Sequence, residues 1–462
     1  MIPLSLDEIA TLTGGAVHDG QPDRVVTGPA FVDTRTPEPD GLFAAFVGEH
    51  ADGHDHATQA LALGAAAVLG SRPTGVPTVV VHDVRAALQQ LAHEVVARLR
   101  TAGALDVHAL TGSQGKTSAK DLLGAVLASD GPTVATAGSF NNELGMPLTA
   151  LRADADTRHL VLEMGARGIG HLTELCAVVR PDVSVVLNVG TAHLGEFGSR
   201  ENIAQAKGEL VEALGADGVA VLNADDPMVA AMASRTRAGV RTFGRAPSAD
   251  VRLLDLELDD LGRPAFTLVA DGARAGVRLQ VLGAHQALNA AAVAAAATST
   301  GMALADVATA LSGVAALSRW RMELRERSDG LVVVNDAYNA NPESMRAALE
   351  TLAELGRRTG RRTVAVLGEM RELGPDAPAA HAAVGALLDQ LGIDEAVVVG
   401  SGAAAVRGRT TRHVEGVDEA VSWLRQNVRG TDVVLVKASR AARLERVAQA
   451  LTSDGTGQEA ER

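Results

Sequence analysis

The sequence predicts an α/β protein built from three domains. The chain has 462 residues, which is enough for two to four domains of ordinary size. Short apolar runs that end in polar residues recur through its middle and its last third, and this pattern is typical of parallel sheets. The pattern changes near residues 105 and 319. We therefore expect domains at residues 1–105, 106–318 and 319–462.

The first region mixes short strands with one long helix. Strands are predicted at residues 66–69 and 78–81, and an amphipathic helix is predicted at about residues 85–100. Residues 101–106 have the composition of a linker. We expect a small α/β domain that ends at this linker.

The second region begins with a strand, a glycine-rich loop and a helix. The strand is predicted at residues 107–110 and the helix from Ser118. Further strands of a mostly parallel sheet are expected at residues 160–162, 184–187 and 219–222. From about residue 250 to residue 281 apolar and polar residues alternate, which predicts a small antiparallel excursion. An alanine-rich helix at about residues 285–298 closes the region.

The third region alternates strands with helices, which is the pattern of a Rossmann-like α/β domain. It begins near Arg319. Its strands are predicted at residues 331–334, 363–367, 396–399 and 433–436. Helical segments lie between these strands, so a second sheet with helical connections is expected.

Bulk composition excludes several classes of partner. Hydrophobic residues make up 47% and charged residues 21% of the chain, as in ordinary soluble globular proteins. A net charge of −14 argues against nucleic acid or an anionic membrane as the main partner. We expect no signal peptide and no membrane span. Cys176 is the single cysteine, so no intramolecular disulfide can form, and a reducing cytoplasm fits.

Lysine is rare in this chain, and its positions are informative. The four lysines are Lys116, Lys120, Lys207 and Lys437, whereas arginine supplies almost all other positive charge. Codon bias in a high-GC genome explains the arginines of the surface. A lysine that remains is expected where a compact charge on phosphate, or the chemistry of a primary amine, is needed.

A phosphate loop is predicted between the strand at 107–110 and the following helix. Small residues let backbone N–H groups approach phosphate oxygens, and the helix N-terminus adds partial positive charge. Lys116 can reach the β- and γ-phosphates, and the Thr117 hydroxyl can bind Mg²⁺. An exposed lysine on a glycine turn is the alternative. The loop comprises Thr111, Gly112, Ser113, Gln114, Gly115, Lys116 and Thr117.

Three residues farther along are candidates for metal binding. Glu163 and His193 follow predicted strands, so both are expected at the edge of the sheet that carries Lys116. Lys207 lies on a helix that begins near Arg200. A carbamate on the Lys207 amine would be an anionic metal ligand, and only lysine can carry that modification. The alternatives are a surface acid, a structural histidine and a solvated lysine.

These residues and their spacing resemble the Mur ligase family along nearly the whole chain. The phosphate loop has the form T-G-x-x-G-K-T, which is typical of Mur ligases and folylpolyglutamate synthases. Residues 141–147 (N-N-E-L-G-M-P) and 283–289 (G-A-H-Q-A-L-N) are similar to two further family segments. The resemblance implies a first domain that binds UDP, a central P-loop ATPase domain and a C-terminal ligase domain. It also implies two Mg²⁺ ions on Thr117, Glu163, His193 and carbamylated Lys207.

The resemblance further implies roles in binding the nucleotide. Asn289 is expected to hold the adenine, and Arg321 is expected to contact the nucleotide from the third domain. Asp336 would lie near the ribose and Lys437 near the reacting phosphoryl group. Tyr338, the only tyrosine of the chain, either stacks on adenine or packs half-buried at the end of a strand.

The third domain indicates which amine the enzyme uses. Residues 335–342 (N-D-A-Y-N-A-N-P) and 367–374 (L-G-E-M-R-E-L-G) resemble signatures of the family member that adds D-alanyl-D-alanine. Asn339 and Asn341 are expected to place the dipeptide or the nucleotide, or else to stabilise a turn. The family pattern K-G-S-R occurs here as K-A-S-R, with Ala438 in place of the glycine, and Ser439 is expected to contact substrate.

The expected substrates follow from the same resemblance. Thr34 and Arg35 lie in a pattern similar to that of the UDP-sugar-binding domain, although a structural turn is the alternative. Asn141 and Asn142 are expected to contact substrate. Lys116, His193, Lys207 and Lys437 are the predicted catalytic residues.

We predict an ATP-dependent ligase that joins D-alanyl-D-alanine to UDP-N-acetylmuramoyl tripeptide through an acyl-phosphate. The third residue of the tripeptide, lysine or diaminopimelate, stays open. We expect a cytoplasmic monomer. The alternatives are another Mur ligase, a folylpolyglutamate synthase, or a P-loop NTPase that regulates without ligating.

Overall fold

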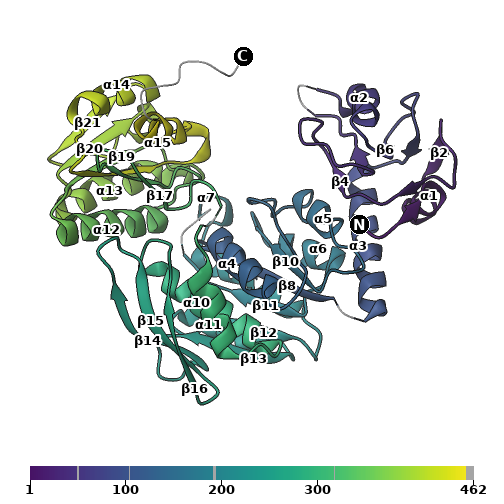
Figure 1. Ribbon diagram of the computed structural model, residues 1–462, viewed down its shortest axis with the longest axis horizontal. Helices are drawn as coiled ribbons and strands as arrows, with labels where there is room; N and C mark the ends of the chain where they lie inside the picture. Colours follow the sequence, from purple (N-terminus) through teal and green to yellow (C-terminus); the bar gives the residue numbers. More distant parts are fainter. Residues whose placement is uncertain (49–50, 104, 191–193, 317, 454–462) are drawn as a thin grey trace.

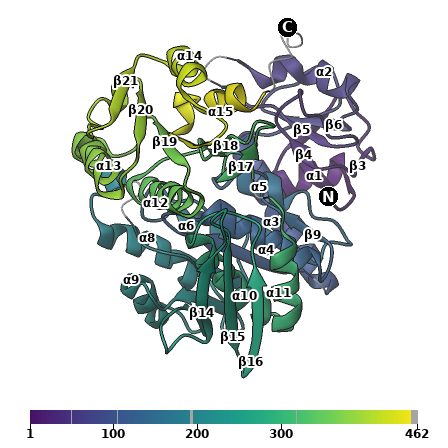
Figure 2. The same ribbon diagram turned by 60° about the vertical axis from the view of Figure 1, so that its left-hand side comes forward.

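The computed structural model describes residues 1–48, 51–103, 105–190, 194–316 and 318–453. It confirms the predicted α/β architecture. The described residues form three regions with their own main sheets. The central region lies between the N-terminal and C-terminal regions in Figure 1 and below both of them in Figure 2. The exact domain boundaries at residues 105 and 318 stay predictions.

The N-terminal region contains a five-stranded sheet and a two-stranded pair. The sheet has the order β2-β7-β6-β5-β4, and β1 pairs with β3. Its strands are β1 (Leu4–Ser5), β2 (Ala16–His18), β3 (Val25–Val26), β4 (Ala30–Phe31), β5 (Leu42–Ala44), β6 (Ala67–Gly70) and β7 (Thr78–Val80). Its helices are α1 (Leu6–Thr13), η1 (Gly53–His56), α2 (Ala57–Ala62) and α3 (Val84–Ala102).

Helix α3 connects this region to the centre. Asp83 caps its first turn by accepting hydrogen bonds from the backbone N–H groups of Arg85 and Ala86, and Gly103 ends it in the left-handed conformation. The helix packs against α5 and α6 of the central region. Arg85, in the first turn of α3, lines a cavity together with residues of the central region.

The central sheet has nine strands in the order β16-β15-β14-β13-β12-β11-β8-β10-β9. Strands β8 to β14 pair in parallel, and β15 and β16 continue the sheet antiparallel, as predicted for residues 250–281. The strands are β8 (Asp106–Thr111), β9 (Thr133–Ala135), β10 (His159–Glu163), β11 (Val183–Val186), β12 (Val219–Asn223), β13 (Gly239–Gly244), β14 (Val251–Leu258), β15 (Pro264–Ala270) and β16 (Ala273–Arg278).

Helices cover both faces of this sheet. Helix α10 is alanine-rich and buried from Ala290 to Ala297, and its small side chains allow close packing against α4. The helices are α4 (Lys116–Ala128), α5 (Gly145–Ala150), α6 (His171–Val178), α7 (Leu194–Phe197), α8 (Arg200–Glu212), α9 (Pro227–Ala230), η2 (Ala231–Arg235), α10 (His285–Ser299) and α11 (Leu304–Gly313).

The C-terminal region is a six-stranded sheet in the order β17-β18-β22-β19-β20-β21. Only its edge strand β17 runs antiparallel. The strands are β17 (Glu323–Glu326), β18 (Val332–Asn335), β19 (Arg362–Leu367), β20 (Glu395–Val399), β21 (Thr411–Val414) and β22 (Asp432–Lys437). The helices are α12 (Pro342–Thr359), η3 (Gly374–Asp376), α13 (Ala377–Leu391), η4 (Ser401–Ala403), α14 (Val417–Asn427), η5 (Arg440–Ala442) and α15 (Glu445–Thr452).

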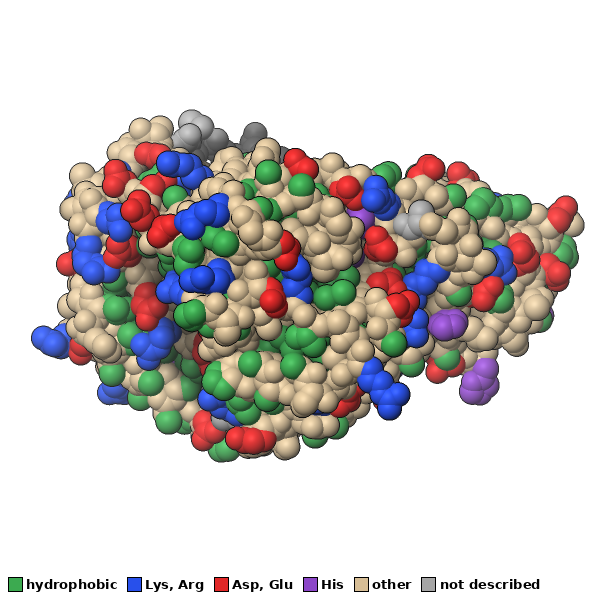
Figure 3. Space-filling view, turned by 90° about the horizontal axis from the view of Figure 1, so that it is seen from below, with side chains coloured by type: hydrophobic (Ala, Val, Ile, Leu, Met, Phe, Trp, Pro, Cys, Tyr) green, Lys and Arg blue, Asp and Glu red, His purple; other side chains and the backbone are tan. Residues whose placement is uncertain are grey.

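The surface agrees with the composition. Acidic and basic side chains are interspersed on the face that Figure 3 shows, rather than gathered into one basic field. Among the described residues, no helix is both long and apolar enough to cross a bilayer.

Candidate functional site

A cavity of about 710 Å³ lies at the carboxyl edge of the central sheet, beside strand β8. The strand order reverses at β8, which is where ligands bind in open α/β sheets. The loops after β18 and β19, the last residue of β22 and the start of α12 line another part of the cavity. The predicted site residues that line it are Ser113, Gln114, Gly115, Lys116, Thr117, Asn141, Asn142, Glu163, Lys207, Asn289, Arg321, Asp336, Tyr338, Asn339, Asn341 and Lys437.

The phosphate loop is held by a residue that the sequence analysis did not identify. Asn188, after β11, accepts hydrogen bonds from the backbone N–H of Ser113 (3.1 Å) and Gln114 (3.0 Å). Its side chain also donates to the Gln114 carbonyl at 3.1 Å. The neighbouring strand therefore fixes the loop before any ligand binds. Helix α4 begins at Lys116, two residues earlier than predicted.

Gly115 is required where the loop turns into α4. Its φ is +80°, a conformation that costs L-residues roughly 1–2 kcal/mol. A Cβ at this position would lie 2.8 Å from Oδ1 of Asn289. The loop and the residue predicted to hold adenine are therefore in close contact.

Lys116 folds back onto its own loop. Its Nζ donates to the Gly112 carbonyl at 2.7 Å. Burial lowers the pKa of Lys116, although the Glu163 carboxylate opposes that shift. An anion placed at the loop would compete with the Gly112 carbonyl for this ammonium group.

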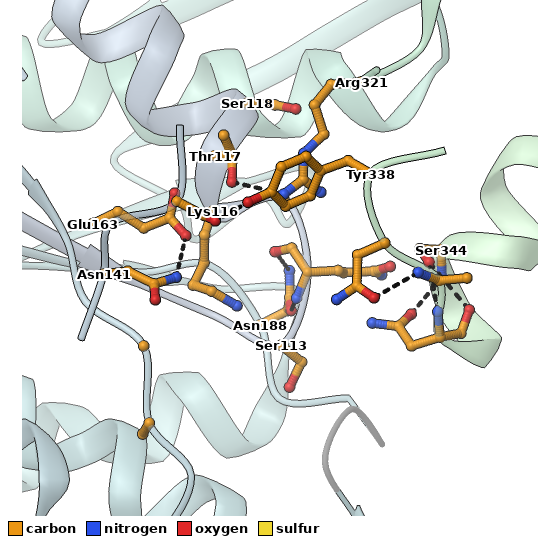
Figure 4. Close-up of a pocket in the computed structure, with 18 of the residues that line it drawn as sticks. Ser113, Lys116, Thr117, Ser118, Asn141, Glu163, Asn188, Arg321, Tyr338 and Ser344 are labelled. Atoms are coloured by element: carbon orange, nitrogen blue, oxygen red, sulfur yellow. Dashed lines mark hydrogen bonds between the residues drawn. The ribbon is translucent and has the colours of Figure 1, made fainter. Parts of the chain in front are cut away.

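Glu163 presents an oxygen without a donor. It stands at the end of β10 and is 1% exposed. Its Oε1 accepts a hydrogen bond from Asn141 Nδ2 at 2.7 Å, whereas Oε2 is buried and has no partner within the described part of the chain (Figure 4). A buried carboxylate oxygen of this kind is suited to a hard cation such as Mg²⁺.

Lys207 is buried on α8 with no hydrogen bond or ion pair to any described residue. Burial, followed by the positive charge of Lys116, holds its pKa well below the usual range. An amine in this environment is neutral more readily and is therefore a better nucleophile. The described residues contain no group of three or more His, Cys, Asp or Glu that could hold a metal.

Arg321 and Tyr338 connect the third region to the phosphate loop. Arg321 Nη2 donates to Thr117 Oγ1 at 3.0 Å, and its guanidinium lies 4.2 Å above the Tyr338 ring (Figure 4). The Tyr338 hydroxyl is hydrogen-bonded to Ser139. A positive group therefore already contacts the hydroxyl that was predicted to bind metal, and Tyr338 is half-buried at the end of β18.

Lys437 is paired in the interior of the third region. Its Nζ contacts Asp336 Oδ2 at 2.5 Å and the Asn339 carbonyl at 3.0 Å. Asp336 Oδ1 accepts the backbone N–H of Met322 at 3.1 Å. Burial lowers the pKa of Lys437, although Asp336 acts in the opposite direction. Both predicted residues line the cavity but satisfy each other.

The remaining predicted residues are placed in two ways. Asn142 accepts the Gly145 backbone N–H at 2.9 Å, and Asn341 caps α12, so both stabilise turns at the cavity wall. Gly112, Thr34, Arg35 and Ser439 are not among the residues that line the cavity. Ser439 accepts the Arg371 backbone N–H at 2.9 Å, and Arg35 is paired with Asp33. His193 lies outside the described residues.

Models of one family match most of the chain. The Mur ligase middle domain matches residues 110–297, the Mur ligase glutamate ligase domain residues 320–440, and the Mur ligase family catalytic domain residues 32–110. The chain is 48% identical to the UDP-N-acetylmuramoyl-tripeptide--D-alanyl-D-alanine ligase of Mycobacterium tuberculosis (strain ATCC 25618 / H37Rv), over 99% of both chains.

Two solved structures are similar over nearly their whole length. The first is UDP-N-acetylmuramoylalanyl-D-glutamyl-2,6-diaminopimelate--D-alanyl-D-alanyl ligase from Acinetobacter baumannii, with a TM-score of 0.84 and 30% identity, covering 98% of this chain and 99% of that chain. The second is the MurF ligase of Thermotoga maritima in complex with ADP, with a TM-score of 0.79 and 30% identity, covering 92% and 97%.

Proposed function

The chain belongs to the Mur ligase family, and from that premise we propose that it joins D-alanyl-D-alanine to UDP-N-acetylmuramoyl tripeptide at the expense of ATP. The observation that carries the proposal is the 48% identity to the mycobacterial ligase over 99% of both chains. The signature at residues 335–342 supports the dipeptide as the amine. The proposed product is the UDP-linked pentapeptide.

The phosphate loop is the proposed binding site for the ATP phosphates. Lys116 would exchange the Gly112 carbonyl for the β- and γ-phosphate oxygens, where its charge offsets the charge that develops during phosphoryl transfer. Asn289 would bind the adenine beside Gly115. Arg321 would turn from Thr117 to the nucleotide, and the Tyr338 ring already lies against its guanidinium group.

Two Mg²⁺ ions are part of the proposal, and His193 enters it from the family resemblance alone because it lies outside the described residues. Thr117 Oγ1 and Glu163 Oε2 would hold one ion, and His193 and a carbamate on Lys207 would hold the other. When bound, such ions neutralise phosphate charge and orient the transferring group. The buried, partnerless oxygen of Glu163 supports the first site. The low pKa of the Lys207 amine supports carbamate formation, since only the neutral amine reacts with CO₂.

The ligation itself is proposed to proceed in two steps. The terminal carboxylate of the tripeptide attacks the γ-phosphate, which gives an acyl-phosphate and ADP. The amine of the dipeptide then attacks the acyl carbon, and phosphate leaves. Asn339 and Asn341 line the cavity on the third region and would place the dipeptide. Closing the third region over the cavity would exclude the water that hydrolyses the intermediate.

We further propose that the protein is cytoplasmic and monomeric.

One assay tests this proposal. Purified protein with ATP, Mg²⁺ and UDP-muramoyl tripeptide should release phosphate only when D-alanyl-D-alanine is present, and mass spectrometry should detect the pentapeptide. Release with a different amine would keep the acyl-phosphate chemistry and overturn the proposed dipeptide. Release that needs neither substrate would identify an NTPase instead.

A further inference from the structure

The cavity wall includes two arginines, Arg85 and Arg167, whose side chains have no partner among the described residues. Most arginines of this chain bond a carboxylate or a carbonyl. In contrast, the guanidinium groups of Arg85 and Arg167 make no hydrogen bond or ion pair with any described residue, although both residues line the cavity. Unpaired guanidinium groups at the wall of a binding cavity are suited to bind carboxylates, because the planar fork of donors matches two oxygens.

We propose that Arg167, on the loop between β10 and α6, binds a free carboxylate in the peptide part of the acceptor substrate. This inference rests on the proposed function, because it needs a peptide whose terminal carboxyl group reacts in this cavity. Arg167 follows Glu163 by four residues, a span of at most about 14 Å. The guanidinium group of Arg167 can therefore reach the substrate residue next to the one whose carboxyl group reacts.

The loop that carries Arg167 is fixed at both ends. The Gly165 backbone N–H donates to the Asn141 carbonyl at 2.8 Å, which ties the loop to the segment that holds Glu163. At the other end the buried Glu209 accepts the Gly170 backbone N–H at 2.6 Å and the Thr173 backbone N–H at 3.0 Å. These hydrogen bonds therefore fix the position of the loop relative to Glu163 at the carboxyl edge of the central sheet.

His171 adds a second donor beside Arg167. Its Nδ1 accepts the Arg167 backbone N–H at 3.2 Å, so a neutral ring carries its proton on Nε2. His171 lines the same cavity. Arg85 stands on the first turn of α3, which packs against α6, and Gln89 one turn later donates to the Glu143 carbonyl at 3.2 Å. These donors come from the N-terminal and central regions, and none comes from the third region.

The chemistry of the acceptor fits this group of donors. The Acinetobacter baumannii relative is named for an alanyl-D-glutamyl-2,6-diaminopimelate acceptor. A D-glutamyl residue in a chain keeps one carboxylate free. Diaminopimelate has two carboxylates, of which one joins the dipeptide and one stays free. Arg167 binds one of these two free carboxylates, which share the same chemistry.

The test compares acceptors that lack one carboxylate each. Arg167→Met removes the charge and keeps the length of the side chain, and Arg167→Lys keeps the charge without the fork. Arg237→Met is the control, because Arg237 is exposed and does not line the cavity. With the diaminopimelyl acceptor we expect Arg167→Met to raise the KM for the UDP-tripeptide roughly ten- to hundredfold, which is the range for a charged hydrogen bond. Arg167→Lys should have a KM for the UDP-tripeptide between those of Arg167→Met and the wild type. The KM values for ATP and dipeptide, and the thermal midpoint, should stay unchanged.

The source of the carboxylate follows from two further acceptors. If the diaminopimelyl carboxylate is bound, Arg167→Met and wild type should have equal KM values for a lysyl tripeptide. If the D-glutamyl carboxylate is bound, they should be equal for a D-isoglutaminyl tripeptide. An unchanged KM for the diaminopimelyl acceptor, or an equal rise for all three acceptors, would overturn the inference. A wild-type protein that forms no pentapeptide would instead overturn the proposed function.

Discussion

The carboxyl edges of the central sheet and of the C-terminal sheet both carry lysines and acids, but these residues are paired at only one of the two edges. Among the described residues of the central edge, Lys116 has only a carbonyl partner, Lys207 has no partner, and one oxygen of Glu163 accepts no hydrogen bond. At the third edge, Lys437 and Asp336 form a buried ion pair at 2.5 Å. The buried charges of the third edge are therefore paired within the chain, whereas the central edge keeps buried polar groups without partners among the described residues.

This difference distinguishes buried groups that are available to bind a ligand from buried groups that already bind each other. Buried polar groups are hydrogen-bonded as a rule, so a cluster of buried groups without partners indicates a site for another molecule. The pair of Lys437 and Asp336 lines the same cavity, but its ends already satisfy each other. We therefore expect substitutions at the third edge to affect stability first and those at the central edge to affect catalysis first.

The largest effect is expected from Asp336→Ala. It leaves the Lys437 ammonium buried without its partner, and breaking a buried pair from one side costs about 3–5 kcal/mol. The urea midpoint of the transition that includes the third region should fall accordingly. Asp376→Ala is the control, because that carboxylate is exposed and makes no hydrogen bond or ion pair to the described residues. Equal midpoints for the two variants would show that the pair of Lys437 and Asp336 does not stabilise the third region.

Lys116→Ala should have the largest effect on rate at the central edge. Removing one preorganised charge from a transferring phosphoryl group is expected to lower kcat about 10²–10³-fold. The urea midpoint should change little, since the only partner of this side chain in the described part of the protein is the Gly112 carbonyl. Initial rates of phosphate release measure the first effect. Near-normal kcat would contradict the assignment of this loop to ATP.

The sequence predicts the site best where function resides in consecutive residues. The strand predicted at residues 107–110 lies within β8, and the phosphate loop follows it as expected. Glu163 stands at the end of its strand because an acid after a run of apolar residues lies at the edge of a parallel sheet. Each of these predictions needs only the local pattern and the polarity of the strands.

Contacts between distant segments could not be predicted in this way. Asn188 braces the phosphate loop because β11 lies beside β8, and the order of strands in a sheet is not contained in any short pattern. The bond from Arg321 to Thr117 joins residues 204 positions apart. Arg167 gave no signal either, because an arginine in an arginine-rich chain is informative only once its lack of partners is known.

Gly115→Ala tests whether the central edge depends on backbone shape as well as on charge. The φ of +80° predicts a loss of roughly 1–2 kcal/mol in unfolding free energy, and the new Cβ would meet Asn289. Gly360→Ala is the matched control, because its φ is +67° and a Cβ added there would meet no atom within 4 Å. Both variants should lose similar stability, but only Gly115→Ala should raise the KM for ATP. A normal KM for ATP in Gly115→Ala would contradict the proposal that Asn289 binds adenine.

The smallest effect is expected from Lys207→Met in CO₂-free buffer without Mg²⁺. Burial and the charge of Lys116 lower the folded-state pKa of Lys207 well below 10.5, so the unfolded chain binds more protons between that pKa and pH 10.5. The stability of the wild type therefore rises with pH across this window. Methionine has no proton to bind, so the variant should be the more stable protein at neutral pH.

The advantage of Lys207→Met should shrink as the pH approaches 10.5, which urea unfolding at a series of pH values can measure. Adding bicarbonate and Mg²⁺ should then favour the wild type alone, because only its amine can form a carbamate that binds metal. If wild type and variant kept a constant difference in stability from pH 6 to about pH 10, Lys207 would be an ordinary solvated amine. The low-pKa amine proposed for the central edge would then be absent.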